Sequence, residues 1–179
     1  KLTPAELITK IAKLPVRVAS NGRAAKDSDI QRPDNFEGYI FPSLDLLEDP
    51  QEGFGSSIED IVRQQAVDLE TTLHMYGIDG EVSGIEAGPT ITLYSIDSAP
   101  GTKVSSINGV ASDIARSLGA PNIRIVPNAA GRKTVGIEVP NPERESVCIK
   151  ELMSSKKTEK MKLPMFLGKD ASGEPMVED

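Results

Sequence analysis

Cysteine, histidine and tryptophan are nearly missing from this sequence, which contains one, one and none of them. Because Cys148 is the only thiol, an intramolecular disulfide is excluded and a thiolate zinc site is not expected. The single histidine, His74, leaves no material for a histidine metal cluster or a conventional catalytic triad. We therefore expect a reducing compartment, with Cys148 packed in the core and His74 partly exposed on a helix.

Long apolar runs are missing as well. No stretch of eighteen apolar residues and no secretory leader pattern occurs, so we expect no membrane-spanning helix and no export signal in these residues. The 179 residues, of which 38% are apolar, suffice for one domain with appendages. Because the sequence opens with lysine rather than methionine, we interpret it as a piece of a longer protein.

Basic residues are the minority, with 20 against 27 acids and a net charge of −7. This balance argues against a protein that binds nucleic acid through bulk charge. The charge is uneven, however: residues 39–70 hold eight acids and one base, whereas residues 101–140 hold five bases and two acids. The second of these segments can therefore face an anion that the first would repel.

The first 55 residues show little regular patterning. Thr3 and Pro4 predict the start of a short helix that ends near Leu14. The polar residues 15–38 favour a flexible linker. The segment YIFPSLDLLEDP, residues 39–50, has prolines that exclude a long helix, and we expect an extended arm docked on a neighbouring surface.

From Ser56 onward, alternating patterns predict an α+β domain of helix, β-hairpin, helix, β-hairpin and helix. The last helix is expected to start at a cap, Asn141, with Glu143 and Glu145 as charges near its N-terminus. The lysine-rich SSKKTEKMK is expected to be a solvated loop. The predicted elements are a helix at 56–76, strands at 81–87 and 90–97, a helix at 104–118, strands at 122–127 and 134–140, a helix at 142–153, and two short strands around Ser172 and Gly173.

The stretch APGTKVSS, residues 99–106, superficially resembles a phosphate-binding loop. A Walker loop has the pattern GxxxxGK[ST], in which several backbone amides surround the phosphates. Here Thr102 separates Gly101 from Lys103, and Val104 stands where a magnesium-binding hydroxyl would be. The preceding strand belongs to a hairpin, not to a βαβ unit. The stretch therefore does not fit a nucleotide site.

A basic cluster remains as the candidate for function. Arg132 and Lys133 follow the small residues 128–131 at a predicted hairpin tip, where they can reach a phosphate backbone. The alternative is that the tip is polar only because hairpin tips are exposed.

The order of these elements and several of their residues resemble those of a known protein family. The run from Gly88 to Met153 resembles the α domain of the FtsK/SpoIIIE family of DNA translocases, whose blocks are approximately GPVTRFExxPAxGVKVSxI, D[LI]AxxLxA, VRI, PxxG[KR], GIE[IV]PN and RxxVxL[RK]E[IL][LM]. The matching positions are Gly88, Pro89, Ala99, Pro100, Gly101, Lys103, Val104, Ile107, Asp113, Ala115, Leu118, Arg124, Ile125, Gly131, Gly136, Ile137, Glu138, Pro140, Asn141 and Arg144.

Two flanking blocks extend the resemblance over residues 38–179. YIFPSLDLLEDP is similar to the family's YxxPxLDLLxxP segment, and LGKDASGEPMVED is similar to the LGxDxxGxP strand pair that precedes the motor core. The resemblance implies a partly disordered linker at 1–37, a docking arm at 38–55, an FtsK-type α domain at 56–163, and at 164–179 the first strands of a RecA-like motor domain.

Family members are membrane-anchored bacterial motors of chromosome segregation and cell division. The resemblance implies that this segment is a non-catalytic, ring-forming and coupling domain of a hexameric, ATP-driven double-stranded DNA translocase. ATP and Mg²⁺ are expected only in the full-length protein, and no cofactor or metal in this segment. The full-length protein is expected at the cytoplasmic face of the inner membrane, held by an N-terminal anchor, whereas this segment is expected to be soluble. Its expected partners are DNA, copies of itself and the adjoining motor domain.

Within this framework, the candidate DNA-binding residues are Lys103, Arg124, Arg132 and Lys133. Two departures reduce the positive charge: Leu93 replaces a common arginine, and Ser106 stands at a position that is often arginine. The alternative is therefore a packing or protein-interaction module of the same motor without DNA contact. A third class, an enzyme with its own small-molecule site, would require nucleotide binding by this segment.

Overall fold

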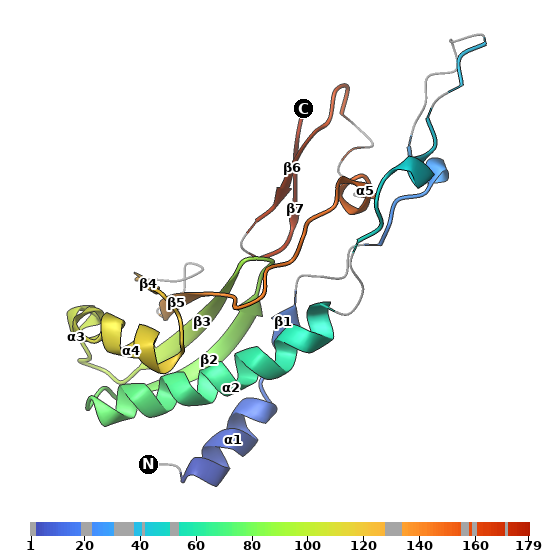
Figure 1. Ribbon diagram of the computed structural model, residues 1–179. Helices are drawn as coiled ribbons and strands as arrows, with labels where there is room; N and C mark the ends of the chain where they lie inside the picture. The colour runs from blue at the N-terminus through green and yellow to red at the C-terminus, as the bar shows by residue number, and fades with distance from the viewer. Residues whose placement is uncertain are drawn as a thin grey trace.

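The structure, a computed structural model, describes residues 3–18, 23–30, 38–40, 42–50, 54–127, 134–154, 158, 161–170 and 172–179. Five strands form a mixed sheet in the order β1-β2-β3-β5-β4, and two strands form a separate hairpin (Figure 1). The α+β class is thereby confirmed. The elements are α1 (Pro4–Ala12), β1 (Val16–Val18), the 3₁₀ turns η1 (Asp27–Asp29) and η2 (Leu44–Leu46), α2 (Phe54–Met75), β2 (Gly80–Ala87), β3 (Ile91–Ser98), α3 (Val104–Gly109), α4 (Ala111–Ser117), β4 (Arg124–Val126), β5 (Val135–Pro140), α5 (Ile149–Leu152), β6 (Met165–Lys169) and β7 (Pro175–Glu178).

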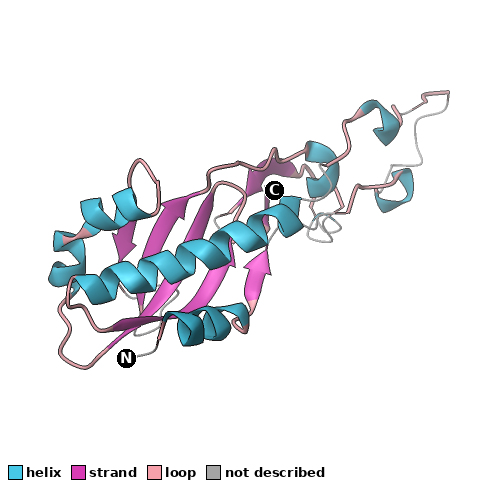
Figure 2. Cartoon of the chain, turned by 60° about the horizontal axis from the view of Figure 1, so that its bottom comes forward, coloured by secondary structure: helices cyan, strands magenta, loops and turns pink. Residues whose placement is uncertain are grey.

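The long helix α2 crosses one face of the sheet (Figure 2). Apolar residues recur on it at helical spacing, and five of the seven in the predicted stripe are buried in the main core: Ile58, Val62, Ala66, Leu69 and Leu73. The other two differ, because Ile61 is half-buried and Tyr76, just after the helix, is exposed. The helix stops where Gly77 adopts a φ of 72°, a left-handed conformation that favours glycine. Burial of this stripe removes apolar surface from water and so stabilises the domain.

Hairpin β2–β3 supplies the centre of the sheet beneath α2. The strands are antiparallel, with Ile85 opposite Tyr94, and both side chains face the helices. The Tyr94 hydroxyl donates to Gln65 Oε1 of α2 at 2.9 Å. Burial raises the pKa of Tyr94, so this hydroxyl stays protonated and fixes the sheet to the helix.

The N-terminal segment joins the domain. The backbone N–H of Thr3 donates to Glu6 at 2.7 Å, and Leu7 and Ile11 of α1 are buried against α2, so the predicted first helix is confirmed. The expectation that residues 15–38 carry no regular structure is wrong for β1, which pairs in parallel with β2. A three-residue strand is formed here because the edge of β2 that β3 does not occupy offers unpaired backbone groups.

Two predicted helices differ from the structure. The helix expected at 104–118 is broken at Val110, which lies between α3 and α4 with φ −109° and ψ 11°. Glycine and a β-branched residue adjoin there, and both weaken a helix. The helix expected at 142–153 is only α5, because Asn141 does not cap it. Its buried amide instead bonds Gly88 and Thr92 at the end of the sheet.

The described part of the arm contains η2, whose Leu44 is buried. The N–H of Leu44 donates to Asp27 at 3.2 Å, so this segment packs against the residues around η1. Asp49 pairs with Lys150 of α5 at 2.7 Å, so the arm also contacts the C-terminal part of the chain. The two short strands expected around Ser172 are confirmed as β6 and β7.

Candidate nucleic-acid interface

Lys103 precedes α3 at the end of a tight turn. The turn is closed by the N–H of Thr102, which donates to the carbonyl of Ala99 at 3.0 Å, and Gly101 within it has a φ of 93°. Lys103 has an extended backbone and an exposed side chain. Within the described part of the chain it makes no ion pair, so its ammonium is available to an anion.

The same turn lies at the rim of a cleft of about 680 Å³ that the residues Ser98 and Ala99 help to line. The cleft is strongly acidic, which opposes nucleotide phosphates. The strand before the turn, β3, pairs with β2 in an antiparallel hairpin, as the sequence predicts, and does not begin a βαβ unit. The charged residues that line it are Glu6, Glu70, Asp79, Glu81 and Asp97, with His74 beside them.

Arg124 lies on the edge strand β4, opposite Glu138 of β5. Its guanidinium is 3.1 Å from the Glu138 carboxylate and its side chain is 75% exposed. Because exposed ion pairs contribute only about 0–1 kcal/mol, a phosphate can compete with Glu138 for Arg124. Arg124 is thus a partly neutralised candidate.

The face of the sheet opposite the helices carries this pair. One row of neighbouring residues crosses all five strands, in the order Arg17, Glu86, Leu93, Glu138 and Arg124. The two glutamates flank the leucine and the two arginines lie at the outer ends of the row, so the row has no net positive charge. Arg124 therefore lies in a neutral row, not in the basic patch that the sequence suggests.

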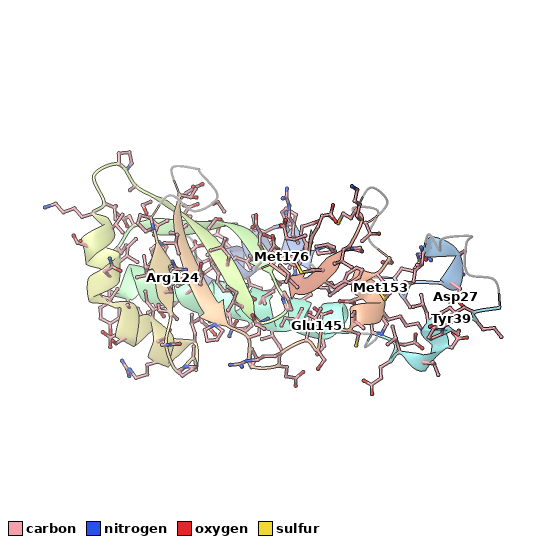
Figure 3. The ribbon with its side chains drawn as sticks, turned by 90° about the horizontal axis from the view of Figure 1, so that it is seen from above. Asp27, Tyr39, Arg124, Glu145, Met153 and Met176 are labelled. Atoms are coloured by element: carbon pink, nitrogen blue, oxygen red, sulfur yellow. The ribbon has the colours of Figure 1, made fainter. Side chains whose placement is uncertain are left out.

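Arg132 and Lys133 lie outside the described residues. The described strand ends on either side lie at one end of the sheet: Val126 is opposite Gly136, and Val135 is opposite Ile96 near the end of β3. Lys103 follows that same end of β3. Figure 3 shows Arg124 at the α3–α4 side of the molecule, away from Glu145 and Met176.

Other functional chemistry is limited in the described residues. They contain no group of three histidine, cysteine or acidic side chains that could hold a metal ion. Their helices are all too short or too polar to cross a membrane. Cys148, expected in the core, lies half-buried as the residue before α5.

Sequence reasoning missed a second charged cluster. Glu145 was expected near a helix N-terminus, but it lies before α5 and forms an ion pair with Lys169 of β6. Glu151 pairs with the same lysine. Lys169 lies 24 residues after Glu145 in the sequence, so no local pattern signals their contact.

Comparison with known proteins gives a family match for this region of the chain. Residues 41–141, which include α2, the strands β2 to β5 and the Lys103 turn, match the family described as FtsK alpha domain. The chain belongs to the FtsK alpha domain family. The elements α1, β1, α5, β6 and β7 lie outside the matched range.

Curated relatives extend the similarity of this FtsK alpha domain chain. It is 38% identical over 177 residues to the DNA translocase FtsK of Azospirillum brasilense, covering 97% of the chain and 28% of the relative. It is 40% identical over 149 residues to that of Agrobacterium fabrum, covering 80% and 16%. It is 36% identical over 174 residues to that of Caulobacter vibrioides, covering 94% and 21%. The chain thus spans less than a third of these relatives.

Proposed function

We propose that this chain is a non-catalytic, ring-forming and coupling domain of a hexameric, ATP-driven double-stranded DNA translocase that serves chromosome segregation and cell division. The observation that carries the proposal is membership of the FtsK alpha domain family, with relatives named DNA translocases that are more than three times longer. ATP and Mg²⁺ are then bound by the motor domain of the full-length protein. An N-terminal anchor holds that protein at the cytoplasmic face of the membrane.

The hairpin β6–β7 supports a coupling role. Four large apolar side chains on or beside it are exposed, and exposed apolar patches mark surfaces that bind other protein. Such a surface fits packing against further protein, which we assign to the adjoining motor domain. The exposed side chains are Leu163, Met165, Leu167 and Met176.

DNA contact is assigned to Lys103, Arg132 and Lys133, with Arg124 as a weaker candidate because Glu138 competes for it. The net charge of −7 argues against tight binding by one copy. In a ring of six copies, however, each domain needs only one or two phosphate contacts, because linkage to the other copies raises the effective concentration.

The test is the salt dependence of duplex DNA binding by the full-length hexamer. Replacing Arg132 and Lys133 by alanine should weaken binding and flatten the slope of log K against log salt, by about 0.9 for each lost phosphate contact. Arg116→Ala is the matched control, because Arg116 is exposed but paired with Asp113 on its own helix. An unchanged slope in the double variant would remove both residues from the interface.

The second candidate is a packing module of the same motor that does not touch DNA. The neutral row across the sheet and the excess of acids in residues 39–70 favour it. Crosslinks from Tyr39 or Leu47 to the motor domain, combined with no crosslink from residue 132 to DNA, would select this second function.

A further inference from the structure

A buried cluster of three charges joins the hairpin β6–β7 to the rest of the chain. The Lys169 ammonium is 3.2 Å from Glu145 and also forms an ion pair with Glu151. Their side chains are 2%, 3% and 2% exposed, so water scarcely reaches them. This cluster belongs neither to the candidate DNA-contact residues nor to the apolar core. We call Lys169, Glu145 and Glu151 the ion triad.

Local backbone chemistry directs Lys169 into the triad. The β6–β7 pairing shifts between Phe166 and Gly168, so one residue bulges out of the strand. Gly168 has a φ of 135°, a conformation that side chains rarely adopt, and the chain is thereby redirected immediately before Lys169. The next residue, Asp170, accepts from the N–H groups of Ser172 and Glu174 and closes the turn.

The two acids lie in different parts of the chain, and together they connect the hairpin to the sheet and to α5. The N–H of Glu145 donates to the carbonyl of Pro89 at 2.8 Å, in the turn that joins β2 and β3. Glu151 belongs to α5. Lys169 therefore connects its hairpin to both the five-stranded sheet and α5 in one contact. Figure 3 shows Glu145 on the side of the molecule near Met153 and Met176, at the junction of these parts.

The energetics favour a role in geometry over a role in stability. Two carboxylates share one ammonium, and Glu145 Oε2 is buried without a hydrogen-bond partner in the described residues. Burial raises the pKa of Glu145, and the nearby Glu151 carboxylate raises it further, against the opposing effect of Lys169. Apolar side chains of similar size would hold the hairpin at least as firmly, but they would not select one orientation, whereas directional charge contacts do.

We propose that the ion triad of Lys169, Glu145 and Glu151 is a rigid joint that fixes the orientation of β6–β7 relative to the five-stranded sheet. The use of this joint in the motor rests on the proposed function. When the motor segment after β7 moves, the joint transmits that motion to the five-stranded sheet, whereas a flexible linker would absorb it. Lys169 is then a positioning residue of the coupling path.

The test separates orientation from stability in the 179-residue chain. Spin labels are placed at two exposed residues, Ser172 on the hairpin turn and Asp60 on α2, in a Cys148→Ser background. Distance distributions between them are measured for the original chain and for the triple variant K169M, E145L and E151L. We expect the triple variant to unfold at an equal or higher urea concentration, yet to show a distribution at least twofold wider.

The matched control is the variant K150M with D49A, which removes an ion pair of the same helix that points to the arm instead of the hairpin. Its label distances should be unchanged. A distribution of original width in a folded triple variant would overturn the proposal.

A measurement on the unaltered chain keeps the proposal testable if the triple variant does not fold. With a rigid joint, the amides of β6 and β7 should show hydrogen exchange protection within tenfold of that of Glu145 N, because both open together. Exchange of the hairpin a hundredfold faster than that of Glu145 would show an independently moving hairpin and overturn the joint. Both readouts use the isolated chain, so they hold or fail independently of DNA translocation.

Discussion

The side-chain amide of Asn141 donates to the carbonyl of Gly88 at 2.8 Å, while its oxygen accepts from the Thr92 hydroxyl at 2.7 Å. The backbone N–H of Asn141 also donates to Thr90 at 2.9 Å. Residue 141 follows the end of β5, so these bonds close the sheet against the β2–β3 turn. A side chain engaged in this way cannot also cap a helix, which explains why α5 begins later than the sequence suggests.

Asn141→Ala should destabilise the chain through these groups. The variant leaves the buried Thr92 hydroxyl and the Gly88 carbonyl without partners, and an unsatisfied buried polar group costs about 1–3 kcal/mol. We expect the free energy of unfolding, measured by urea denaturation, to fall by about 2–4 kcal/mol. The exposed Asn122→Ala is the control and should change it by less than about 0.5 kcal/mol. Equal effects of the two variants would contradict the role of Asn141.

Lys10→Met should change how Glu81 titrates. The Lys10 ammonium lies 2.8 Å from Glu81 and also bonds Glu70, and the hydrogen bond from Lys10 lowers the pKa of Glu81. In the variant, the pKa of Glu81 should rise toward its ordinary value of 4.5. The measurement is an NMR titration of the side-chain carboxyl carbons, with the exposed Lys13→Met as the control.

The sign of the effect on stability follows from the same pair. The pKa of Glu81 is lower in the folded chain than in the unfolded chain, so its contribution to stability is present above the unfolded pKa and is lost as the pH falls through the folded pKa. The difference in unfolding free energy between the original chain and Lys10→Met should therefore shrink as the pH falls below about 4.5. A difference that stays constant with pH would show that Lys10 acts only through packing.

The pair of Arg124 and Glu138 should contribute little to stability. The two side chains are 75% and 22% exposed, and double-mutant cycles on exposed pairs give about 0.2–1 kcal/mol. Alanine at both positions, singly and together, should yield a coupling energy in that range. If so, any loss of DNA binding by Arg124→Ala reports a lost contact instead of unfolding. A coupling energy above about 2 kcal/mol would make Arg124 a structural residue.

Elements with a strong internal pattern could be predicted from the sequence. The stripe of α2 and the strands of β2–β3 carry their periodicity in their own residues, and both lie where expected. β1 could not be predicted, because three residues become a strand only through the free edge of β2. The break at Val110 was also missed, since the apolar spacing of α3 and α4 continues through it.

The candidate site was predicted less completely, for a related reason. The family resemblance and the local excess of basic residues make Lys103 and Arg124 candidates, but the register of β4 against β5 decides that Arg124 meets Glu138, fourteen residues away. For Lys169 the sequence predicts only a place near a strand, because its partners come from α5 and from the chain before α5. Pairings between distant segments require the fold, which local patterns do not contain.

Two glycine substitutions should have opposite effects because only one glycine has a left-handed backbone. An added Cβ meets no atom within 4 Å at either Gly168 or Gly109, so neither alanine variant clashes. Gly168 has a φ of 135°, whereas Gly109 lies in α3 without a positive φ. We expect Gly168→Ala to cost about 1–3 kcal/mol of unfolding free energy and Gly109→Ala to be neutral or stabilising by up to about 1 kcal/mol. Urea denaturation of both variants checks this. Since Gly168 redirects the chain just before Lys169, Gly168→Ala should also broaden the distribution of distances between spin labels at Ser172 and Asp60. A Gly168→Ala chain as stable as Gly109→Ala would show that the bulge carries no strain.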